Sequence, residues 1–248
     1  MSFTGNTVLI TGGTSGIGRA LAETLQQKGN NVIIAGRRRN LLDEVTKANP
    51  GMQAVELNMD DAADITRVAQ QVTRDFPALN AVINNAGIMR AEDVKKGELE
   101  TAEAIITTNL LGPIRLTEAL IPHLLQQTKA TIFTVSSGLA FVPLAITPTY
   151  CATKAAIHSW TMSLRYQLRE TNVRVREIIP PWVATELMGE KPSDPRAMPL
   201  EEFIAETVEL IDDDTLDEIA VQRVLPLRNA AKTDELAFFR QFNASAPH

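Results

Sequence analysis

The chain has 248 residues and a formal charge of −6, with 44% hydrophobic and 22% charged residues. This balance is typical of a globular protein, the length is compatible with one α/β domain, and the acidic charge argues against nucleic acid or an anionic membrane as a partner. A single cysteine, Cys151, excludes an internal disulfide, and the absence of a basic secretory leader and of an apolar run of roughly 18 residues favours a cytoplasmic protein without membrane insertion.

Short apolar runs alternate with helical patterns through the first 180 residues. Buried strands are predicted at 8–10, 32–35, 54–57, 81–83, 131–135 and 173–179. Apolar residues spaced three or four apart predict helices at about 17–25, 41–45, 65–72, 102–109, 114–125 and 149–169. Continuous apolar strands that alternate with amphipathic helices indicate a parallel sheet covered on both faces. We therefore expect a doubly wound, Rossmann-like α/β fold in a single domain, 1–248.

The last quarter of the chain is less regular. The stretch 186–200 is expected to form a loop or substrate lid, because it is rich in proline and methionine and mixed in charge. After Leu200 we predict a helix, a short strand near 219–221 and a C-terminal helical segment over 222–243.

The turn after the first strand is rich in glycine, with the sequence TGGTSGIG at 11–18. Such glycines permit a tight turn and the close approach of a pyrophosphate, while the following helix offers free N–H groups and the positive end of its dipole. In the alternative, the glycines only permit the turn, but the strand–turn–helix context favours a nucleotide. The expected cofactor contacts here are Gly12, Thr14, Ser15, Gly16, Ile17 and Gly18.

The second strand ends without the acidic residue that holds the ribose hydroxyls of NAD in dinucleotide-binding folds. Gly36 stands at that position, and Arg37 and Arg38 follow. A glycine leaves space there, and a guanidinium pairs well with the 2′-phosphate of NADP. The sequence therefore predicts NADP(H) in preference to NAD(H), with both arginines as ligands. In the alternative, the arginines only cover a solvated loop.

Tyr150 and Lys154 stand four residues apart, so on a helix their side chains lie on one face. An ammonium beside a phenol favours the phenolate, so the pKa of Tyr150 is expected to fall below its usual value of about 10. This makes Tyr150 a candidate general acid and base. The same spacing also occurs on solvated helix faces.

Together and in this order, the motifs resemble the short-chain dehydrogenase/reductase family, in its single-domain dehydrogenase branch. The resemblance covers about residues 5–190. It rests on TGGTSGIG at 11–18, NNAG at 84–87, Asn109 in TTNLLG, Ser137 in VSSG and YCATK at 150–154. Pro180-Pro181 replaces the family's usual Pro-Gly, and the chain ends in a helix rather than a glycine-rich strand. Both departures resemble the DltE-like subgroup.

The resemblance implies a function and a set of site residues. Tyr150 would exchange a proton with the substrate oxygen, Lys154 would lower the phenol's pKa and bind the nicotinamide ribose, and Ser137 would hydrogen-bond the reacting oxygen. Asn109 would support a water relay to Lys154. Further cofactor contacts would be Asn58, Met59, Asn85, Ala86, Gly87, Pro180, Val183 and Thr185, besides Tyr150 and Lys154. The implied activity is that of an NADP(H)-dependent oxidoreductase that interconverts a carbonyl and a secondary alcohol in a homodimer or homotetramer.

Several alternatives stay open. The apolar residues between Ser137 and Tyr150 either line a pocket for an apolar small-molecule substrate or pack on the lid or a second subunit. A redox-sensing regulatory protein and a non-redox isomerase or dehydratase are rival functions on the same fold. The three histidines show no metal-ligand spacing with cysteine or carboxylates, so we predict no metal.

Overall fold

Seven parallel strands form one sheet, and helices cover both of its faces. The computed structural model describes residues 3–97, 99–189, 194–230 and 234–244. The strands are β1 (Thr7–Thr11), β2 (Asn31–Gly36), β3 (Gln53–Glu56), β4 (Leu79–Asn84), β5 (Ala130–Val135), β6 (Val173–Ile179) and β7 (Glu218–Ala220). Their order in the sheet is β3-β2-β1-β4-β5-β6-β7, and every neighbouring pair is parallel. The predicted doubly wound parallel sheet is confirmed.

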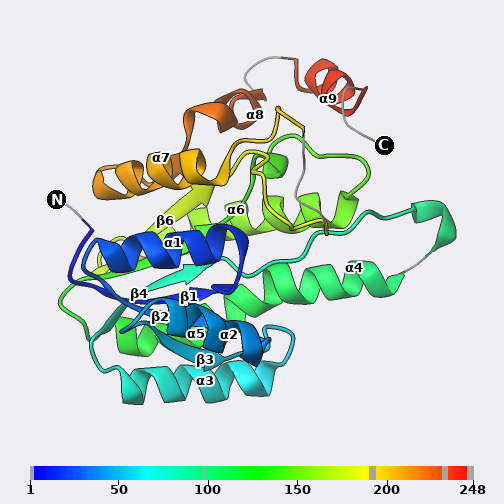
Figure 1. The fold of residues 1–248 in the computed structure, drawn as a ribbon. Helices are drawn as coiled ribbons and strands as arrows, with labels where there is room; N and C mark the ends of the chain where they lie inside the picture. Colours follow the sequence, from blue (N-terminus) through cyan, green and yellow to red (C-terminus); the bar gives the residue numbers. More distant parts are fainter. Residues whose placement is uncertain (1–2, 98, 190–193, 231–233, 245–248) are drawn as a thin grey trace.

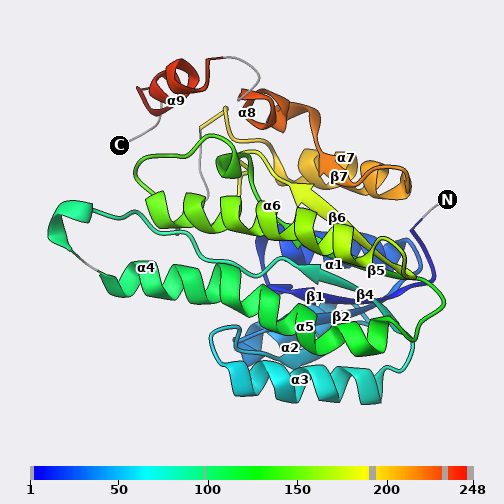
Figure 2. The same cartoon turned by 180° about the vertical axis from the view of Figure 1, so that it is seen from behind.

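The helices lie in two layers, which Figures 1 and 2 show from opposite sides. They are α1 (Gly16–Gln27), α2 (Arg39–Ala48), α3 (Ala62–Asp75), α4 (Leu99–Ile106), α5 (Gly112–Leu124), α6 (Pro148–Leu168), α7 (Leu200–Asp212), α8 (Leu225–Arg228) and α9 (Glu235–Ala244). Alternate strand residues face opposite layers. Val8 and Ile10 pack with residues of α1, α2 and α7, whereas Leu9 packs with residues of α3, α5 and α6. The central strands β1, β4 and β5 are therefore mainly apolar, because both of their faces are buried.

The structure joins two helices that the sequence pattern separates. Residues Thr107–Leu111 form a π-helical turn, η2, that connects α4 directly to α5. The predicted break between 109 and 114 is therefore wrong. A π turn holds one extra residue, so the apolar spacing changes there although the chain stays helical. Such turns are frequent at functional sites, and Asn109 lies within this one.

The C-terminal part of the chain continues the sheet and then crosses toward its carboxyl edge. The short strand that was expected near 219–221 is β7, the outermost strand beside β6. The segment predicted to be helical from 222 to 243 contains a 3₁₀ turn, α8 and α9, and residues 231–233 lie outside the described part. Within the described residues, no helix combines the length and apolarity that crossing a bilayer requires.

A buried guanidinium fixes α7 against the edge of the sheet. Arg176 on β6 is 2% exposed. Its nitrogens donate to four main-chain carbonyl oxygens at or just beyond the end of α7, those of Leu210 at 3.0 Å, Ile211 at 2.6 Å, Asp213 at 2.7 Å and Leu216 at 2.8 Å. Carbonyl groups at the end of a helix have no hydrogen-bond partner within the helix. The Arg176 guanidinium therefore supplies their donors and also places a positive charge at the negative end of the helix dipole.

Arg176→Met is expected to destabilise the protein by about 3 kcal/mol, because it leaves several buried carbonyls without donors. Urea denaturation measures the loss. The matched control is Arg174→Met on the same strand, whose half-buried guanidinium donates, among the described residues, to Leu216 and Asp217. The control should cost less than about 1 kcal/mol. Equal losses in the two variants would contradict the special role of Arg176.

Candidate active site

The candidate active site lies where the carboxyl ends of β1, β4, β5 and β6 meet at one edge of the sheet. Each of these strands leads directly into a predicted motif. The motifs are the glycine turn at 12–18, residues 85–87, Ser137 and the segment that begins at Pro180. The strand order reverses between β1 and β4, and doubly wound sheets bind their ligands at such a switch point. Parallel pairing therefore gathers residues that are far apart in sequence.

The glycine turn is shaped for close approach of a ligand. Gly12 and Gly16 have positive φ values of 68° and 53°. A β-carbon on Gly18 would lie 2.3 Å from the carbonyl oxygen of Gly12, so only glycine allows α1 to pack this closely on β1. Ser15 precedes α1 but makes no side-chain capping bond to it. The first N–H groups of α1 thus face the turn without a side-chain acceptor, which suits an anion.

The N-terminus of α3 provides a contrast at the same edge. There Asp61 caps the helix by accepting hydrogen bonds from the main-chain N–H groups of Ala63 and Asp64. Asp61 thus already satisfies the first donors of α3, as an N-cap aspartate commonly does. The uncapped turn before α1 therefore fits the diphosphate of a dinucleotide, whereas the start of α3 does not.

The two predicted phosphate ligands, Arg37 and Arg38, point in different directions. Arg38 donates to the side-chain hydroxyls of Thr14 at 3.3 Å and Ser15 at 3.4 Å, both in the glycine turn. Arg37 instead donates to the carboxylate of Asp60 at 3.1 Å. Arg38 alone of the pair therefore contacts the glycine turn, a difference that sequence position did not reveal.

Asn58 and Met59, expected beside the adenine, connect the nucleotide end to the catalytic helices. The side-chain oxygen of Asn58 accepts from the N–H of Asp60 at 3.2 Å, and Asp60 also accepts a hydrogen bond from Thr108 in the π turn. Met59 is buried, and a β-carbon on Gly112 would lie 2.8 Å from its carbonyl oxygen. The loop after β3 thus packs tightly on the helix that carries Asn109.

Thr11 holds the ends of β1 and β4 together, a role that the sequence did not reveal. Its hydroxyl oxygen accepts from the N–H groups of Asn85 at 3.1 Å and Ala86 at 3.0 Å. The side-chain amide of Asn85 donates back to the Thr11 carbonyl at 2.9 Å. Residues 85–87 are consequently held beside the glycine turn. Threonine is also common in strands, so no residue-type signal could have singled out Thr11.

Asn109 uses its amide to hold the chain that follows residues 85–87. Its oxygen accepts from the N–H of Ile88 and its nitrogen donates to the carbonyl of Ile88, both at 2.8 Å. Gly87 lies between this amide and the lysine: a β-carbon there would be 3.3 Å from the Asn109 oxygen and 3.8 Å from the Lys154 ammonium. The structure thus brings Asn109 near Lys154, and the water relay stays a prediction.

Lys154 is almost completely buried, with 5% of its surface exposed. Its ammonium donates to the Val135 carbonyl at 2.7 Å and lies 5.5 Å from the centre of the Tyr150 ring. Burial lowers the pKa of Lys154 to about 8, and the negative charge of Glu177 acts against that shift. At neutral pH the side chain is therefore still mostly charged, in a place where a charge is costly.

The prediction for the pKa of Tyr150 is wrong in this structure. Burial raises the pKa of Tyr150 above its ordinary value, and the hydrogen bond with Ser137 opposes the shift only in part. Tyr150 is 6% exposed, so a phenolate there would lose most of its hydration. The hydroxyl of Ser137 is likewise buried and accepts from the N–H of Leu139 at 3.1 Å. Both hydroxyls are thus protonated and fixed at neutral pH.

Apolar residues surround Tyr150 on the side away from the glycine turn. The cluster consists of Ile105, Tyr150 and Cys151, with Ile88, Met89, Leu139 and Leu144 packed against it. The C-terminal helix α9 contacts the segment between Ser137 and Tyr150. The side chain of Asn243 accepts from the N–H of Ala145 at 2.6 Å and donates to the carbonyl of Pro143 at 3.0 Å. Sequence analysis missed Asn243, whose partner residues lie about 100 positions away.

The segment after β6 lies over the glycine turn. Pro180 accepts from the N–H of Gly138 at 2.8 Å, and Val183 forms a bridge with Met198. A β-carbon on Gly16 would lie 3.6 Å from Thr185. Of the residues predicted for the nicotinamide side, Thr185 therefore lies beside the glycine turn, whereas Pro180 contacts the segment after Ser137. The predicted lid at 186–200 includes residues 190–193, which lie outside the described residues.

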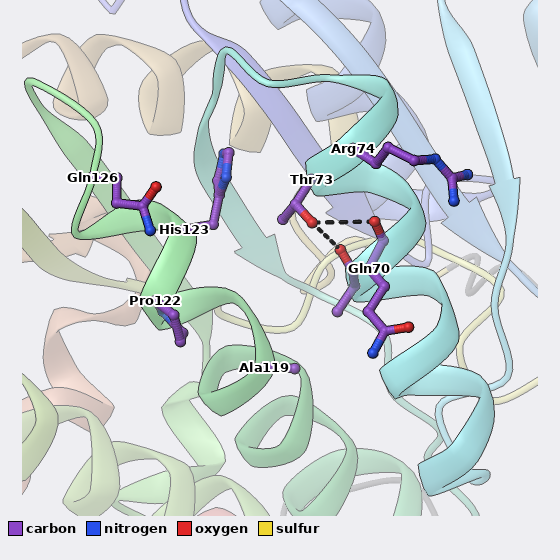
Figure 3. A pocket seen from close by; sticks show the side chains of 8 residues that line it. Gln70, Thr73, Arg74, Ala119, Pro122, His123 and Gln126 are labelled. Atoms are coloured by element: carbon purple, nitrogen blue, oxygen red, sulfur yellow. Dashed lines mark hydrogen bonds between the residues drawn. The ribbon is translucent and has the colours of Figure 1, made fainter.

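A groove between α3 and α5 lies apart from these residues (Figure 3). His123 borders it and contacts the carbonyl of Leu79, at the amino end of β4, at 3.0 Å. Thr73 in its wall bonds only to main-chain carbonyls of its own helix among the described residues. The groove contains none of the predicted site residues and lies toward the opposite edge of the sheet.

Comparisons with known proteins agree with this geometry. A family model described as short chain dehydrogenase matches residues 6–196. The chain is 40% identical over 250 residues to the uncharacterized oxidoreductase DltE of Bacillus subtilis (strain 168), with 98% of each chain covered.

Two solved structures show the same fold over nearly the whole chain. A short chain dehydrogenase from Burkholderia cenocepacia J2315 in complex with NADP has a TM-score of 0.85 at 24% identity and covers 100% of both chains. A short-chain dehydrogenase from Sphingobium yanoikuyae in complex with NADPH has a TM-score of 0.81 at 25% identity, covering 98% of this chain and 96% of that one. With a family match over most of its length and a full-length relative at 40% identity, the chain belongs to the short-chain dehydrogenase family, as a DltE-like oxidoreductase.

Proposed function

We propose that this oxidoreductase uses NADP(H) to interconvert a carbonyl compound and a secondary alcohol, with Tyr150 as the general acid and base. One observation carries the proposal: two buried hydroxyls, those of Tyr150 and Ser137, and the Lys154 ammonium lie at the edge of the sheet that also holds the uncapped glycine turn. A buried lysine, tyrosine and serine serve packing poorly, so their joint presence in this position favours catalysis.

The proton chemistry follows from the states of these groups. A bound nicotinamide would supply the hydride in reduction and accept it in oxidation. During reduction, negative charge develops on the substrate oxygen, where the hydroxyls of Tyr150 and Ser137 would donate hydrogen bonds. The raised pKa of Tyr150 keeps its phenol protonated and ready to give its proton. The Lys154 ammonium would then stabilise the phenolate that remains.

The preference for NADP(H) is supported by the nucleotide end of the site. Gly36 leaves the end of β2 without a carboxylate, and Arg38 stands beside the glycine turn. A guanidinium there would pair with a 2′-phosphate. Solved structures of the same fold contain NADP, NADPH or NAD, which supports a nicotinamide cofactor in either form. Arg37 would have to leave Asp60 before it could contribute.

The proposal extends to the substrate, the assembly and the location. The apolar cluster beside Tyr150 supports a small apolar carbonyl or alcohol as substrate. A homodimer or homotetramer is supported by large apolar side chains exposed along the α4–α5–α6 side of the protein, which Figure 2 shows in front. These residues are Leu99, Ile106, Leu111, Leu125, Met162 and Tyr166. The free, buried thiol of Cys151 supports a cytoplasmic location.

Tyr150→Phe tests the acid and base role. The turnover rate of the variant should fall on the order of 10²–10⁴-fold, because phenylalanine keeps the ring but has no hydroxyl proton to transfer. NADPH absorbance with a panel of apolar ketones and aldehydes measures turnover, and fluorescence titration should show NADPH binding retained. Tyr166→Phe is the control, since Tyr166 lies on the same helix and is 67% exposed. Full turnover in Tyr150→Phe would contradict the mechanism.

Arg38→Ala tests the cofactor preference. Loss of a charge-assisted contact to the 2′-phosphate should weaken NADPH binding by about 10- to 100-fold and leave NADH binding nearly unchanged. Arg39→Ala is the control, because that side chain is exposed and pairs with Asp43 on its own helix. Tighter binding of NADH than NADPH by the unmodified protein, or equal losses for both cofactors, would refute the preference.

Lys154→Met tests whether this lysine is kept for its chemistry at the expense of stability. A pKa lowered from 10.5 to about 8 means that the buried charge costs about 3 kcal/mol at pH 7. Methionine removes the charge but also the bond to Val135, so we expect a net gain of about 2 kcal/mol together with lost turnover.

The stability gain of Lys154→Met should depend on pH, and the lowered pKa of Lys154 fixes the direction of that dependence. Between pH 8 and 10.5 the unfolded chain binds more protons at Lys154 than the folded chain, so the stability of the unmodified protein rises with pH there. The advantage of Lys154→Met should be greatest below about pH 8 and shrink toward pH 10.5. Denaturation curves at several pH values measure the difference, and a gain that is independent of pH would contradict the argument.

A further inference from the structure

A carboxylate is buried behind the helix that carries Tyr150 and Lys154. Glu177 on β6 is 0% exposed, and its two oxygens lie 3.0 and 2.8 Å from Nδ1 of His158. His158 follows Lys154 by four residues and Tyr150 by eight on α6, so the three side chains share one face of the helix. A fully buried carboxylate is costly even when paired. Its position beneath the catalytic face therefore calls for a reason beyond packing.

The charges continue from His158 to the edge of the sheet. The ligand atoms of His158, Glu177 and Glu218 lie within 4.8 Å of one another, an arrangement that in principle suits a metal ion. However, Arg228 donates to both oxygens of Glu218 at 2.8 Å. A guanidinium thus already supplies the positive charge that a metal would bring. No spacing pattern along the chain could reveal this group, because its members come from α6, β6, β7 and α8.

The charged and titratable groups around Lys154 come from few elements. On its own helix the face holds Tyr150 and His158, and β6 contributes Glu177. The other side chains that enclose its ammonium are neutral, and they are Asn84, Ala86, Asn109, Pro113, Thr134, Val135 and Ile157. The register of the sheet places Glu177 beside Thr134, the residue before Val135, whose carbonyl accepts from the Lys154 ammonium. Among the described residues, Glu177 is the carboxylate whose charge favours the protonated form of Lys154.

We propose that Glu177 is a positioning residue of the reaction: held by His158, its carboxylate supplies the counter-charge that keeps the buried Lys154 charged. This rests on the proposed function, because Lys154 assists Tyr150 only as an ammonium. His158 orients the carboxylate and connects it to Glu218 and Arg228. Phe141, from the segment between Ser137 and Tyr150, lies edge-on to His158 with ring centroids 4.8 Å apart, and its centroid is 4.6 Å from the Arg228 guanidinium, so it packs against this charged group.

Glu177→Gln tests the proposal, because glutamine keeps the shape and the hydrogen bond to His158 but removes the charge. In carbonyl reduction, the alkaline limb of the kcat/KM profile should move down by about one pH unit, since Lys154 loses its proton more readily. Glu170→Gln is the control: it removes the same charge from an exposed position just beyond the same helix and should leave the limb in place. An unchanged alkaline limb in Glu177→Gln would overturn the proposal.

Variants of His158 test the anchoring step. His158→Ala removes the ring that orients the Glu177 carboxylate, so the negative charge is no longer held in place toward Lys154, and the alkaline limb should move in the same direction as in Glu177→Gln. His158→Asn places an amide nitrogen near the former Nδ1 and should restore most of the original profile. Identical profiles for the alanine and asparagine variants would overturn the role of His158 as the anchor.

A denaturation cycle decides the matter without any turnover. The drop in urea midpoint caused by Glu177→Gln at pH 7 should be smaller in the Lys154→Met background than in the unmodified protein, because the charge that Glu177 balances is then absent. Equal drops in both backgrounds would show a purely structural role and overturn the proposal. If no carbonyl in the panel is reduced, the proposed function fails, and this cycle still decides whether Glu177 acts on Lys154.

Discussion

The hydrogen bond from the Lys154 ammonium to the Val135 carbonyl connects the helix that carries Tyr150 to the strand that leads to Ser137. Tyr150 stands one turn before Lys154, and Ser137 stands two residues after Val135. A single contact of 2.7 Å thereby fixes how far apart the two hydroxyls lie. Because the lysine is nearly buried, this bond forms in a medium where electrostatic attraction is strong and an unpaired charge is costly.

The same constraint shapes the neighbouring elements. The π turn at Thr107–Leu111 lets one continuous helix place Asn109 against Ile88 and still bury its apolar residues further along. At the start of the loop after β4, the N–H groups of Asn85 and Ala86 donate to the hydroxyl of Thr11, which joins this loop to β1. The loop after β4 is therefore held at both ends. Gly87 lies between these two attachments, and because it has no side chain it fits beside Lys154. Rigid support of this kind is what a precise proton-transfer geometry needs.

Much of the fold and several site residues could be predicted because their signals are local. The apolar strands, the glycine turn and the spacing of Tyr150 and Lys154 are each contained in a few consecutive residues. The opposite roles of Arg37 and Arg38 could not be predicted, because they depend on Asp60 and Thr14 from other elements.

The raised pKa of Tyr150 could not be predicted for the same reason. Helical spacing shows that a lysine is near, but only the packed structure shows that the phenol of Tyr150 is buried, and burial raises its pKa. The pairing of His158 with Glu177 was hidden for a related reason, since a helix and a strand 19 positions apart must pack together before the charges meet. Sequence patterns report neighbours along an element, whereas these effects come from neighbours across the core.

Two buried cations in this protein show how burial alone does not define a function. Arg176 and Lys154 are both at most 5% exposed. Arg176 donates to four carbonyl oxygens near the end of α7, so its hydrogen-bond donors are largely used by the structure around it. Lys154 has three donors but, within the described residues, makes one bond. Donors of Lys154 are therefore left for other partners at the edge where substrate and cofactor would meet, and that difference distinguishes a residue that stabilises the fold from one that is available for chemistry.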